Sequence, residues 1–285
     1  MRRTPLVTLA IGSVISLISC SGDPGRCLGP NLVRPAAVSP RASGLVLPFK
    51  DARFLNGRWY WVYLPPGYGR TCHRYPVLYM NDGHFISRRT GSPESWGVDS
   101  VCDAMILAKE IEPIIVVGIT SSDSSRFYDY PPFLGGDRYL RAIRDTLKPT
   151  IDRKFATLPD ANHTSIMGAS LGGLISVYAG YAYDGTFGRV AGISGSYSWD
   201  RGRFFDFVSR RGRPAISRLY LDSGTVFDNL GPAREMRDIA LSQGFVLGAD
   251  LFYLEADGAA HEQRYFAARV PGILRFLIDR PSGRD

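Results

Sequence analysis

Residues 164–173 read Thr-Ser-Ile-Met-Gly-Ala-Ser-Leu-Gly-Gly and contain the pattern G-x-S-x-G around Ser170. A short apolar run precedes the pattern, and a helix-forming run, residues 174–179, follows it. This order predicts a strand, a sharp turn and a helix, with the serine hydroxyl lifted clear of the sheet at the turn. Gly168 and Gly172 stand where a Cβ would make the strand and the helix collide. A serine in such a turn is typical of a nucleophile that forms a covalent ester.

The rest of the chain predicts the sheet that carries this turn. Strands that alternate with helices form a mostly parallel sheet with helices on both faces, which is the α/β class. Catalytic groups of such a sheet gather at the carboxyl ends of its strands. We expect the first strand to be an antiparallel edge. The expected strands are 57–64, 76–80, 114–118, 164–168, 190–193, 218–221 and 251–254, and the expected helices are 97–109, 139–151, 200–210, 232–243 and 264–278.

A serine nucleophile needs a base within reach and an acid that orients the base. Downstream of Ser170 the sequence holds a single histidine, His261, in the loop after the last expected strand, and we expect it to be the base. Two aspartates are candidates for the acid. Asp228 is preferred because it lies in a loop, from which its carboxylate can reach the histidine; a turn or helix-cap role is the alternative. Asp222, at the end of a strand, is the second candidate.

The oxyanion of an acyl-transfer intermediate needs two backbone N–H donors. We expect one from Leu171, directly after the nucleophile, and the other from the loop after the strand at 76–80. That loop reads Asn-Asp-Gly-His-Phe over residues 81–85. The amide of His84 is the preferred second donor, because Gly83 lets the backbone approach closely.

The composition argues against several other kinds of site. The formal charge of +7 is spread thinly, with arginines interleaved among aspartates and apolar residues. This pattern indicates a solvated surface rather than a nucleic-acid partner, and an anionic substrate or envelope surface is the alternative. The four histidines are scattered and no Cys/His group has metal-ligand spacing. We therefore expect neither a metal site nor a cofactor.

Six segments, one of them the turn around Ser170, occur in a characteristic order and spacing. They read Val-Tyr-Leu-Pro-Pro-Gly-Tyr at 62–68, Tyr-Met-Asn-Asp-Gly at 79–83, Val-Val-Gly-Ile at 116–119, Leu-Lys-Pro-Thr-Ile-Asp at 147–152, Met-Gly-Ala-Ser-Leu-Gly-Gly at 167–173 and Gly-Ala-Ala-His-Glu at 258–262. With them, the chain from about residue 56 to residue 277 resembles the esterase branch of the α/β-hydrolases. That branch includes enterochelin esterases, feruloyl esterases, the esterase D group and mycolyltransferases, and the enterochelin-esterase-like enzymes are the most similar.

The resemblance implies an α/β-hydrolase fold with the family's serine, acid and histidine at Ser170, Asp228 and His261. The sequence departs from the family pattern in two places. The loop that carries the acid is slightly longer here, which keeps Asp222 as an alternative. His84 stands where many relatives carry glutamine.

Arg126 matches a segment that lies near the substrate pocket in this branch. Its guanidinium would pair either with an acidic or catecholate substrate or with an internal carboxylate such as Asp129. Internal pairing is slightly favoured.

The start of the chain resembles a bacterial lipoprotein signal peptide. Arg2 and Arg3 precede an apolar run, residues 6–18, that is too short to span a bilayer comfortably. The run ends in Leu-Ile-Ser-Cys at 17–20, which implies cleavage before Cys20 and a lipid on its sulfur; an ordinary secretory signal is the alternative. We therefore expect a lipid-anchored protein of the cell envelope, facing the periplasm or the cell surface. The predicted organisation is a signal peptide at 1–19, a flexible tether at 20–43 and an α/β-hydrolase domain at 44–285.

Three more cysteines follow Cys20, namely Cys27, Cys72 and Cys102. In an oxidising compartment one pair can form a disulfide and leave one free thiol. Their spacing does not choose the pair.

Taken together, these residues predict a serine esterase that hydrolyses small-molecule or glycan esters without a cofactor. One alternative is an acyltransferase of the mycolyltransferase type. Another is a non-catalytic binding lipoprotein on a hydrolase scaffold. The intact set of Ser170, Asp228 and His261 argues against the second alternative.

Overall fold

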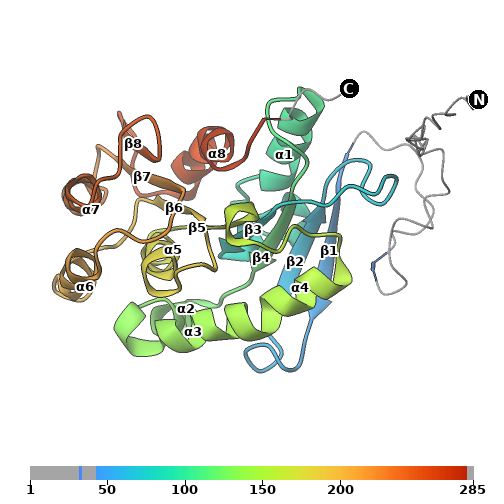
Figure 1. The fold of residues 1–285 in the computed structure, drawn as a ribbon, viewed down its shortest axis with the longest axis horizontal. Coiled ribbons are helices and arrows are strands. Elements are labelled where there is room, and N and C mark those ends of the chain that lie inside the picture. The colour runs from blue at the N-terminus through green and yellow to red at the C-terminus, as the bar shows by residue number, and fades with distance from the viewer. Residues whose placement is uncertain (1–31, 34–42, 281–285) are drawn as a thin grey trace, which may run out of the picture.

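Eight strands form one mixed sheet in the computed structural model, which describes residues 32–33 and 43–280 (Figure 1). The strand order is β1-β2-β4-β3-β5-β6-β7-β8. β2 runs antiparallel to both of its neighbours, and all other neighbouring strands are parallel. The strands are β1 (Leu45–Lys50), β2 (Trp59–Leu64), β3 (Val77–Asn81), β4 (Ile115–Ile119), β5 (Thr164–Ala169), β6 (Arg189–Ile193), β7 (Arg218–Gly224) and β8 (Leu251–Ala256).

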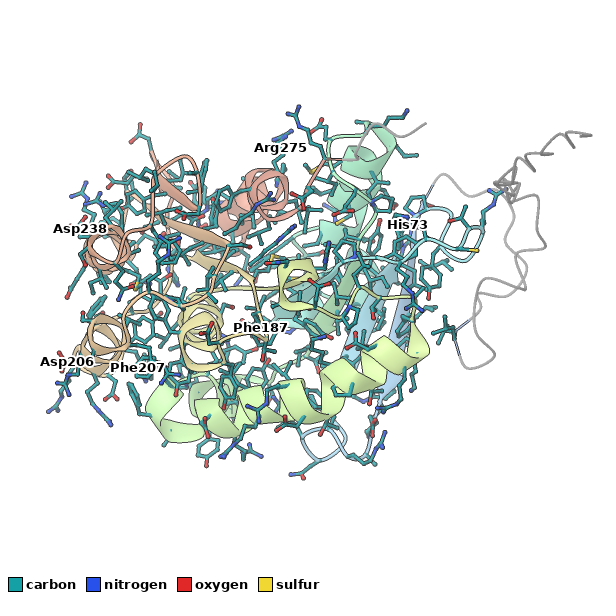
Figure 2. All side chains as sticks on the ribbon, in the orientation of Figure 1. His73, Phe187, Asp206, Phe207, Asp238 and Arg275 are labelled. Carbon is teal, nitrogen blue, oxygen red and sulfur yellow. The ribbon has the colours of Figure 1, made fainter. Side chains whose placement is uncertain are left out.

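Helices cover both faces of this sheet, as the sequence predicts. α1 and α8 share a buried apolar cluster on one face, and α3 to α7 share another on the opposite face. Figure 2 shows side chains filling the space between the helices and the sheet. A π-helical turn joins α3 to α4. The helices are α1 (Val98–Leu107), α2 (Asp123–Asp129), α3 (Asp137–Ala142), α4 (Lys148–Lys154), α5 (Leu171–Ala182), α6 (Arg203–Arg211), α7 (Leu230–Ser242) and α8 (Gln263–Leu277).

Burial on both faces explains the composition of the central strands. Every residue of β3, β4, β5 and β6 is buried, and β4 reads Ile-Val-Val-Gly-Ile. A parallel strand with helices above and below has no polar side, so its apolar residues follow one another without alternation. The parallel strands all end at the same edge of the sheet. The loops that follow them therefore lie close together in space.

Two elements differ from the sequence prediction. The strand expected as an edge, β2, lies inside the sheet, because β1 pairs with its outer side. Pro48 explains why β1 was not expected: proline lacks the N–H that a central strand needs, but an edge strand tolerates it. α2 is the second unexpected element. Its sequence, Asp-Ser-Ser-Arg-Phe-Tyr-Asp, has no apolar period, and it begins at a capping box formed by Ser122 and Ser125.

Most of the predicted signal peptide and tether lies outside the described residues, including the lipobox-like sequence at 17–20. Within the predicted tether, Leu32 and Val33 pack against the core, and the Val33 N–H donates to the carbonyl of Lys154 at 2.7 Å. Across residues 32–33 and 43–280, no helix combines the length and the apolar character needed to cross a membrane. The division into peptide, tether and domain stays a prediction.

The structure describes two of the cysteines, Cys72 and Cys102, and one of them forms a disulfide. Cys72 is disulfide-bonded. Cys102 is a free thiol buried on α1. Burial raises the pKa of the Cys102 thiol, so it stays protonated and unreactive at neutral pH.

The expected turn lies between β5 and α5. The two elements cross so closely that a Cβ added to Gly168 would lie 2.6 Å from the carbonyl carbon of Gly172. A Cβ added to Gly172 would lie 3.2 Å from a carboxylate oxygen of Asp82, which is tight but no collision. The need for glycine two residues before the serine is therefore confirmed. The requirement two residues after it is weaker.

Gly168→Ala should lower the free energy of unfolding by about 1–3 kcal/mol, because the new methyl group forces β5 and α5 apart. Gly231→Ala is a matched control on α7, where an added Cβ meets no atom within 4 Å. Alanine favours a helix, so this control should leave stability unchanged or raise it by up to about 1 kcal/mol. Urea unfolding followed by circular dichroism measures both. Wild-type stability in Gly168→Ala would contradict the close crossing.

Candidate active site

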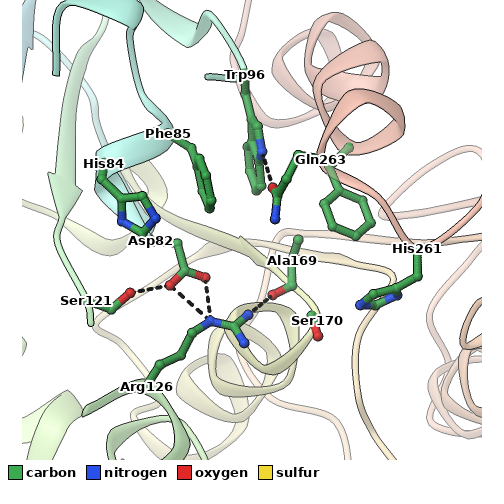
Figure 3. Close-up of a pocket in the computed structure, with 11 residues that line it drawn as sticks. Asp82, His84, Phe85, Trp96, Ser121, Arg126, Ala169, Ser170, His261 and Gln263 are labelled. Carbon is green, nitrogen blue, oxygen red and sulfur yellow. Dashed lines mark hydrogen bonds and ion pairs between the residues drawn. The ribbon is translucent and has the colours of Figure 1, made fainter. Parts of the chain in front are cut away.

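Three residues from separate loops meet at the carboxyl edge of the sheet. Ser170 directly follows β5, Asp228 lies between β7 and α7, and His261 lies between β8 and α8. Ser170 and His261 line one cavity of 280 Å³, which we call the serine cavity. Figure 3 shows the two residues beside each other at one side of it. The three residues chosen from the sequence are thus brought together.

Ser170 has a strained backbone, with φ 60° and ψ −123°. Its N–H donates to the carbonyl of Ile193 at 2.9 Å, and its own carbonyl accepts from the N–H groups of Leu174 and Ser196 at 3.0 Å. These bonds hold a conformation that L-residues rarely adopt. The Ser170 hydroxyl oxygen lies 3.2 Å from that of Ser196. Within the described residues, the Ser170 hydroxyl and the His261 imidazole are not hydrogen-bonded to each other.

Asp228 is the carboxylate that contacts the imidazole. One oxygen, Oδ1, lies 2.7 Å from Nδ1 of His261 and also accepts from the N–H of Asn229 at 2.7 Å. The other, Oδ2, accepts from the Ser194 hydroxyl at 2.6 Å and from the Gly224 N–H at 2.7 Å. Burial opposes ionisation, but these hydrogen bonds outweigh it and lower the pKa of Asp228 to about 2. The carboxylate is therefore ionised at neutral pH.

Asp222, the alternative acid, points elsewhere. Its carboxylate forms a buried ion pair with Arg269 at 2.8 Å. It also accepts from the Ser194 N–H at 2.8 Å and from the Tyr220 hydroxyl at 2.9 Å. Burial raises the pKa of Asp222 to about 6, against the opposing charge of the guanidinium. The structure therefore brings Asp228, and not Asp222, to His261.

Ser194 links the two aspartates and was not singled out from the sequence. Besides its bonds to both carboxylates, its hydroxyl accepts from Nη2 of Arg269 at 3.1 Å, and its carbonyl accepts from the Asn229 side chain at 2.8 Å. It is fully buried and has a positive φ of 43°. Its place directly after β6, at the carboxyl edge of the sheet, is the one sequence signal that could have found it.

The two expected oxyanion donors lie at this edge as well. Leu171 is the first residue of α5, so its N–H has no partner within the helix and lies at the positive end of the helix dipole. His84 lies in a 3₁₀ turn, Gly83–Phe85, which begins two residues after the end of β3, and it lines the serine cavity. Glycine is required at 83, where an added Cβ would lie 2.0 Å from the carbonyl carbon of Gly118. The role of both amides stays a prediction.

Arg126 extends into the serine cavity from α2. The prediction that it pairs with Asp129 is wrong. Its Nε lies 3.0 and 3.1 Å from the two carboxylate oxygens of Asp82, and Nη2 donates to the carbonyl of Ala169 at 3.1 Å (Figure 3). Arg126 is therefore paired with an internal carboxylate, as expected, but its partner is Asp82 in the loop 81–85. Asp129 is already paired with two other guanidinium groups, those of Arg58 and Arg138.

Aromatic side chains form another wall of the serine cavity. Phe85 stacks on Trp96 with ring centroids 5.8 Å apart, and Trp96 contacts Phe266 with centroids 6.0 Å apart. The indole N–H of Trp96 donates to Oε1 of Gln263 at 2.7 Å, which fixes the orientation of the indole ring. The serine cavity thus combines a flat apolar wall, a guanidinium group and an accessible hydroxyl.

This arrangement is suited to acyl transfer. It contains a hydroxyl on a strained turn, an imidazole oriented by a carboxylate, and a helix N-terminus beside them. Over residues 32–33 and 43–280, no cluster of three or more His, Cys, Asp or Glu side chains is placed to hold a metal ion.

The chain is similar in sequence to known esterases. A family model described as "Putative esterase" matches residues 58–275. The uncharacterized protein YbbA of Bacillus subtilis is 23% identical over 79% of this chain and 94% of its own length. An endo-1,4-beta-xylanase/feruloyl esterase of Xylanibacter ruminicola is 33% identical, and an iron(III) enterobactin esterase of Escherichia coli is 27% identical. The matches cover 40% and 64% of this chain but only 16% and 42% of those two proteins.

Solved structures share the fold. The enterobactin esterase FES from Shigella flexneri, determined in the presence of enterobactin, has a TM-score of 0.71 at 20% identity and covers 84% of this chain and 59% of its own. A ferulic acid esterase has a TM-score of 0.67 at 19% identity, over 83% and 98% of the two chains. An IroE-like serine hydrolase from Shewanella oneidensis has a TM-score of 0.65 at 17% identity, over 81% and 79%. These similarities confirm the α/β-hydrolase fold.

Asp222→Asn should lower the free energy of unfolding by about 3–5 kcal/mol, because it leaves the guanidinium of Arg269 buried without a counter-charge. The double variant Asp222→Asn/Arg269→Met removes both charges and should recover most of that loss. Urea unfolding at pH 7 measures both variants. A single variant as stable as the wild type would contradict the structural role of Asp222.

Proposed function

The chain belongs to this esterase family, and from that membership and the geometry of the site we propose that it hydrolyses carboxylic esters through an acyl-serine intermediate. One observation carries the proposal: Asp228 lies 2.7 Å from Nδ1 of His261, and this histidine shares a cavity with Ser170 on its strained turn. A carboxylate at Nδ1 holds the imidazole in the tautomer whose Nε2 is free to accept a proton.

The proposed reaction begins when substrate displaces the Ser170 hydroxyl from Ser196 and turns it toward the imidazole. Ser170 Oγ then attacks the ester carbonyl, and His261 Nε2 takes the hydroxyl proton. When the intermediate collapses, the same proton passes to the oxygen of the departing alcohol. Water attacks the acyl-serine by the same route and releases the acid. Asp228 stays ionised throughout and stabilises the transient imidazolium.

The negative charge that develops on the carbonyl oxygen needs fixed donors. We propose that the N–H of Leu171 supplies one hydrogen bond and the N–H of His84 the other. Leu171 adds the dipole of α5, whose positive end lies at this residue. The Arg126–Asp82 ion pair supports the second donor, because it holds the residue that precedes Gly83 against the end of β5.

We propose that the acyl group carries one aromatic ring. The serine cavity has a volume of 280 Å³ and the flat wall of Phe85 and Trp96, which suits a single ring. Nη1 of Arg126 makes no hydrogen bond within the described residues and is available to a polar substituent on that ring. The names of two structural neighbours support this class: one is a ferulic acid esterase, and the other was solved with 2,3-dihydroxy-N-benzoyl-glycine.

Ser170→Ala should keep the fold and reduce hydrolysis by about 10⁶-fold or to background, because no other hydroxyl lies on the strained turn. Ser196→Ala is the matched control: its hydroxyl lies 3.2 Å from that of Ser170, but Ser196 does not line the serine cavity, so we expect turnover within about tenfold of wild type. Rates on short-chain, feruloyl, acetyl-sugar and trilactone esters measure this.

Full activity in Ser170→Ala would contradict the nucleophile. Binding of these esters by the wild type without hydrolysis would favour the binding-protein alternative. Transfer of the acyl group to a sugar in preference to water would favour the acyltransferase.

We also propose that the protein is attached to the bacterial cell envelope through a lipid on Cys20. This proposal rests on the sequence alone: two arginines, an apolar run at 6–18 and the lipobox-like residues 17–20. A lipid on one cysteine, followed by a Pro- and Gly-rich segment, would let the esterase domain work at a distance from the membrane.

In a bacterial host the mature protein should begin at Cys20, incorporate labelled fatty acid and sediment with membranes. Cys20→Ala should abolish the label and release or mislocalise the protein. A wild-type protein that is unlabelled and soluble would show that residues 1–19 act as an ordinary secretory signal.

A further inference from the structure

A second cavity adjoins the serine cavity on the side of the histidine. Its volume is 510 Å³, and it shares His261 and Gln263 with the serine cavity. Ser170, the aromatic wall and His84 belong to the serine cavity alone. The other residues that line the second cavity are Pro93, Glu94, Ser95, Glu262 and Arg264.

The lining of the second cavity is polar and carries a net negative charge. Glu262 pairs with Arg264 at 2.9 Å, so these two charges offset each other. Glu94 is exposed, and within the described residues its carboxylate has no ion pair or hydrogen bond. One carboxylate is therefore left to act on a ligand. Pro93 is the single apolar residue of the lining.

The chemistry of the proposed reaction assigns a role to this side of the histidine. The proton that His261 accepts from Ser170 must next be delivered to the alcohol oxygen, as the bond between that oxygen and the acyl carbon breaks. Nδ1 is occupied by Asp228, so delivery occurs from Nε2. The departing alcohol must therefore lie against the imidazole and away from the oxyanion donor His84. His261 lines the second cavity and His84 does not, so this cavity is the one that fits the departing alcohol.

We propose that the second cavity binds the alcohol half of the substrate, and that this alcohol is an uncharged polyol such as a sugar. The inference rests on the proposed function, which places the acyl half in the serine cavity. Carboxylates accept strong hydrogen bonds from hydroxyl groups, so Glu94 favours an alcohol with several of them. The same charge repels an alcohol that carries a carboxylate. A methyl or other small alkyl alcohol would leave the cavity unused.

Three esters of one acyl group test the inference: the 4-hydroxybenzoyl esters of methanol, of glucose at O6, and of glycolate. Each kcat/KM is divided by the rate of hydroxide-catalysed hydrolysis of the same ester, which removes the intrinsic reactivity of the alcohol. For the wild type we expect the glucose ester to exceed the methyl ester by about tenfold or more, and the glycolate ester to fall below it.

Glu94→Ala should lower the glucose-to-methyl ratio by about five- to tenfold and raise the glycolate-to-methyl ratio, because it removes both the acceptor and the charge. Glu235→Ala is the matched control: Glu235 is exposed on α7 and outside both cavities, so both ratios should equal those of the wild type. Two opposite shifts from one substitution are not expected from a general loss of stability.

Hydrolysis of all three esters at similar normalised rates, or ratios that Glu94→Ala leaves unchanged, would overturn the inference while the esterase proposal stands. Hydrolysis of none of these esters, nor of the short-chain, feruloyl, acetyl-sugar and trilactone esters, would overturn the proposed function itself. The two failures are therefore distinguishable.

Discussion

The close crossing of β5 and α5 is the contact on which the rest of the site depends. Because Gly168 has no Cβ, the carbonyl of Gly172 can approach it, and the chain between them turns within a few residues. Ser170 takes up the strain of that turn with φ 60°, and its hydroxyl leaves the sheet at the carboxyl edge. The same turn places Leu171 at the positive end of α5. The nucleophile and one proposed oxyanion donor are thus positioned by one backbone contact.

A buried ion pair lies behind the imidazole and complements that contact. Asp222 and Arg269 are both buried, and taking two such charges out of water costs free energy that their attraction offsets. In this fold the pair holds Ser194 by its N–H and by its hydroxyl oxygen, which leaves the hydroxyl proton for Asp228. Asp228 is then fixed toward His261. The ion pair therefore orients the imidazole from a distance, through one serine.

Local features of this molecule were predictable from its sequence. The turn around Ser170 shows in its glycine spacing, the central strands show as unbroken apolar runs, and His261 is the single histidine downstream of the serine. Elements with weak local signals were not predictable. β1 contains Pro48, which interrupts its strand pattern, and α2 is short and polar.

The sequence also did not show which residues, far apart in the chain, form ion pairs and hydrogen bonds with one another. Arg126 reaches Asp82 across 44 positions of the chain, while Asp129, much nearer in sequence, is paired elsewhere. Ser194 has no motif of its own, and its role comes from the two carboxylates that the fold brings to it. Partner choice among charged residues depends on the assembled sheet rather than on sequence distance.

Covalent labelling tests the central claim most directly, namely that Ser170 is the group activated by His261 and Asp228. The folded protein is treated with an aryl fluorophosphonate, and the adduct is mapped by mass spectrometry of its peptides. We predict one adduct per chain, on Ser170, and labelling slowed by orders of magnitude in His261→Ala and Asp228→Asn. An adduct on any other residue, or equally fast labelling of Ser170 in those two variants, would contradict the account.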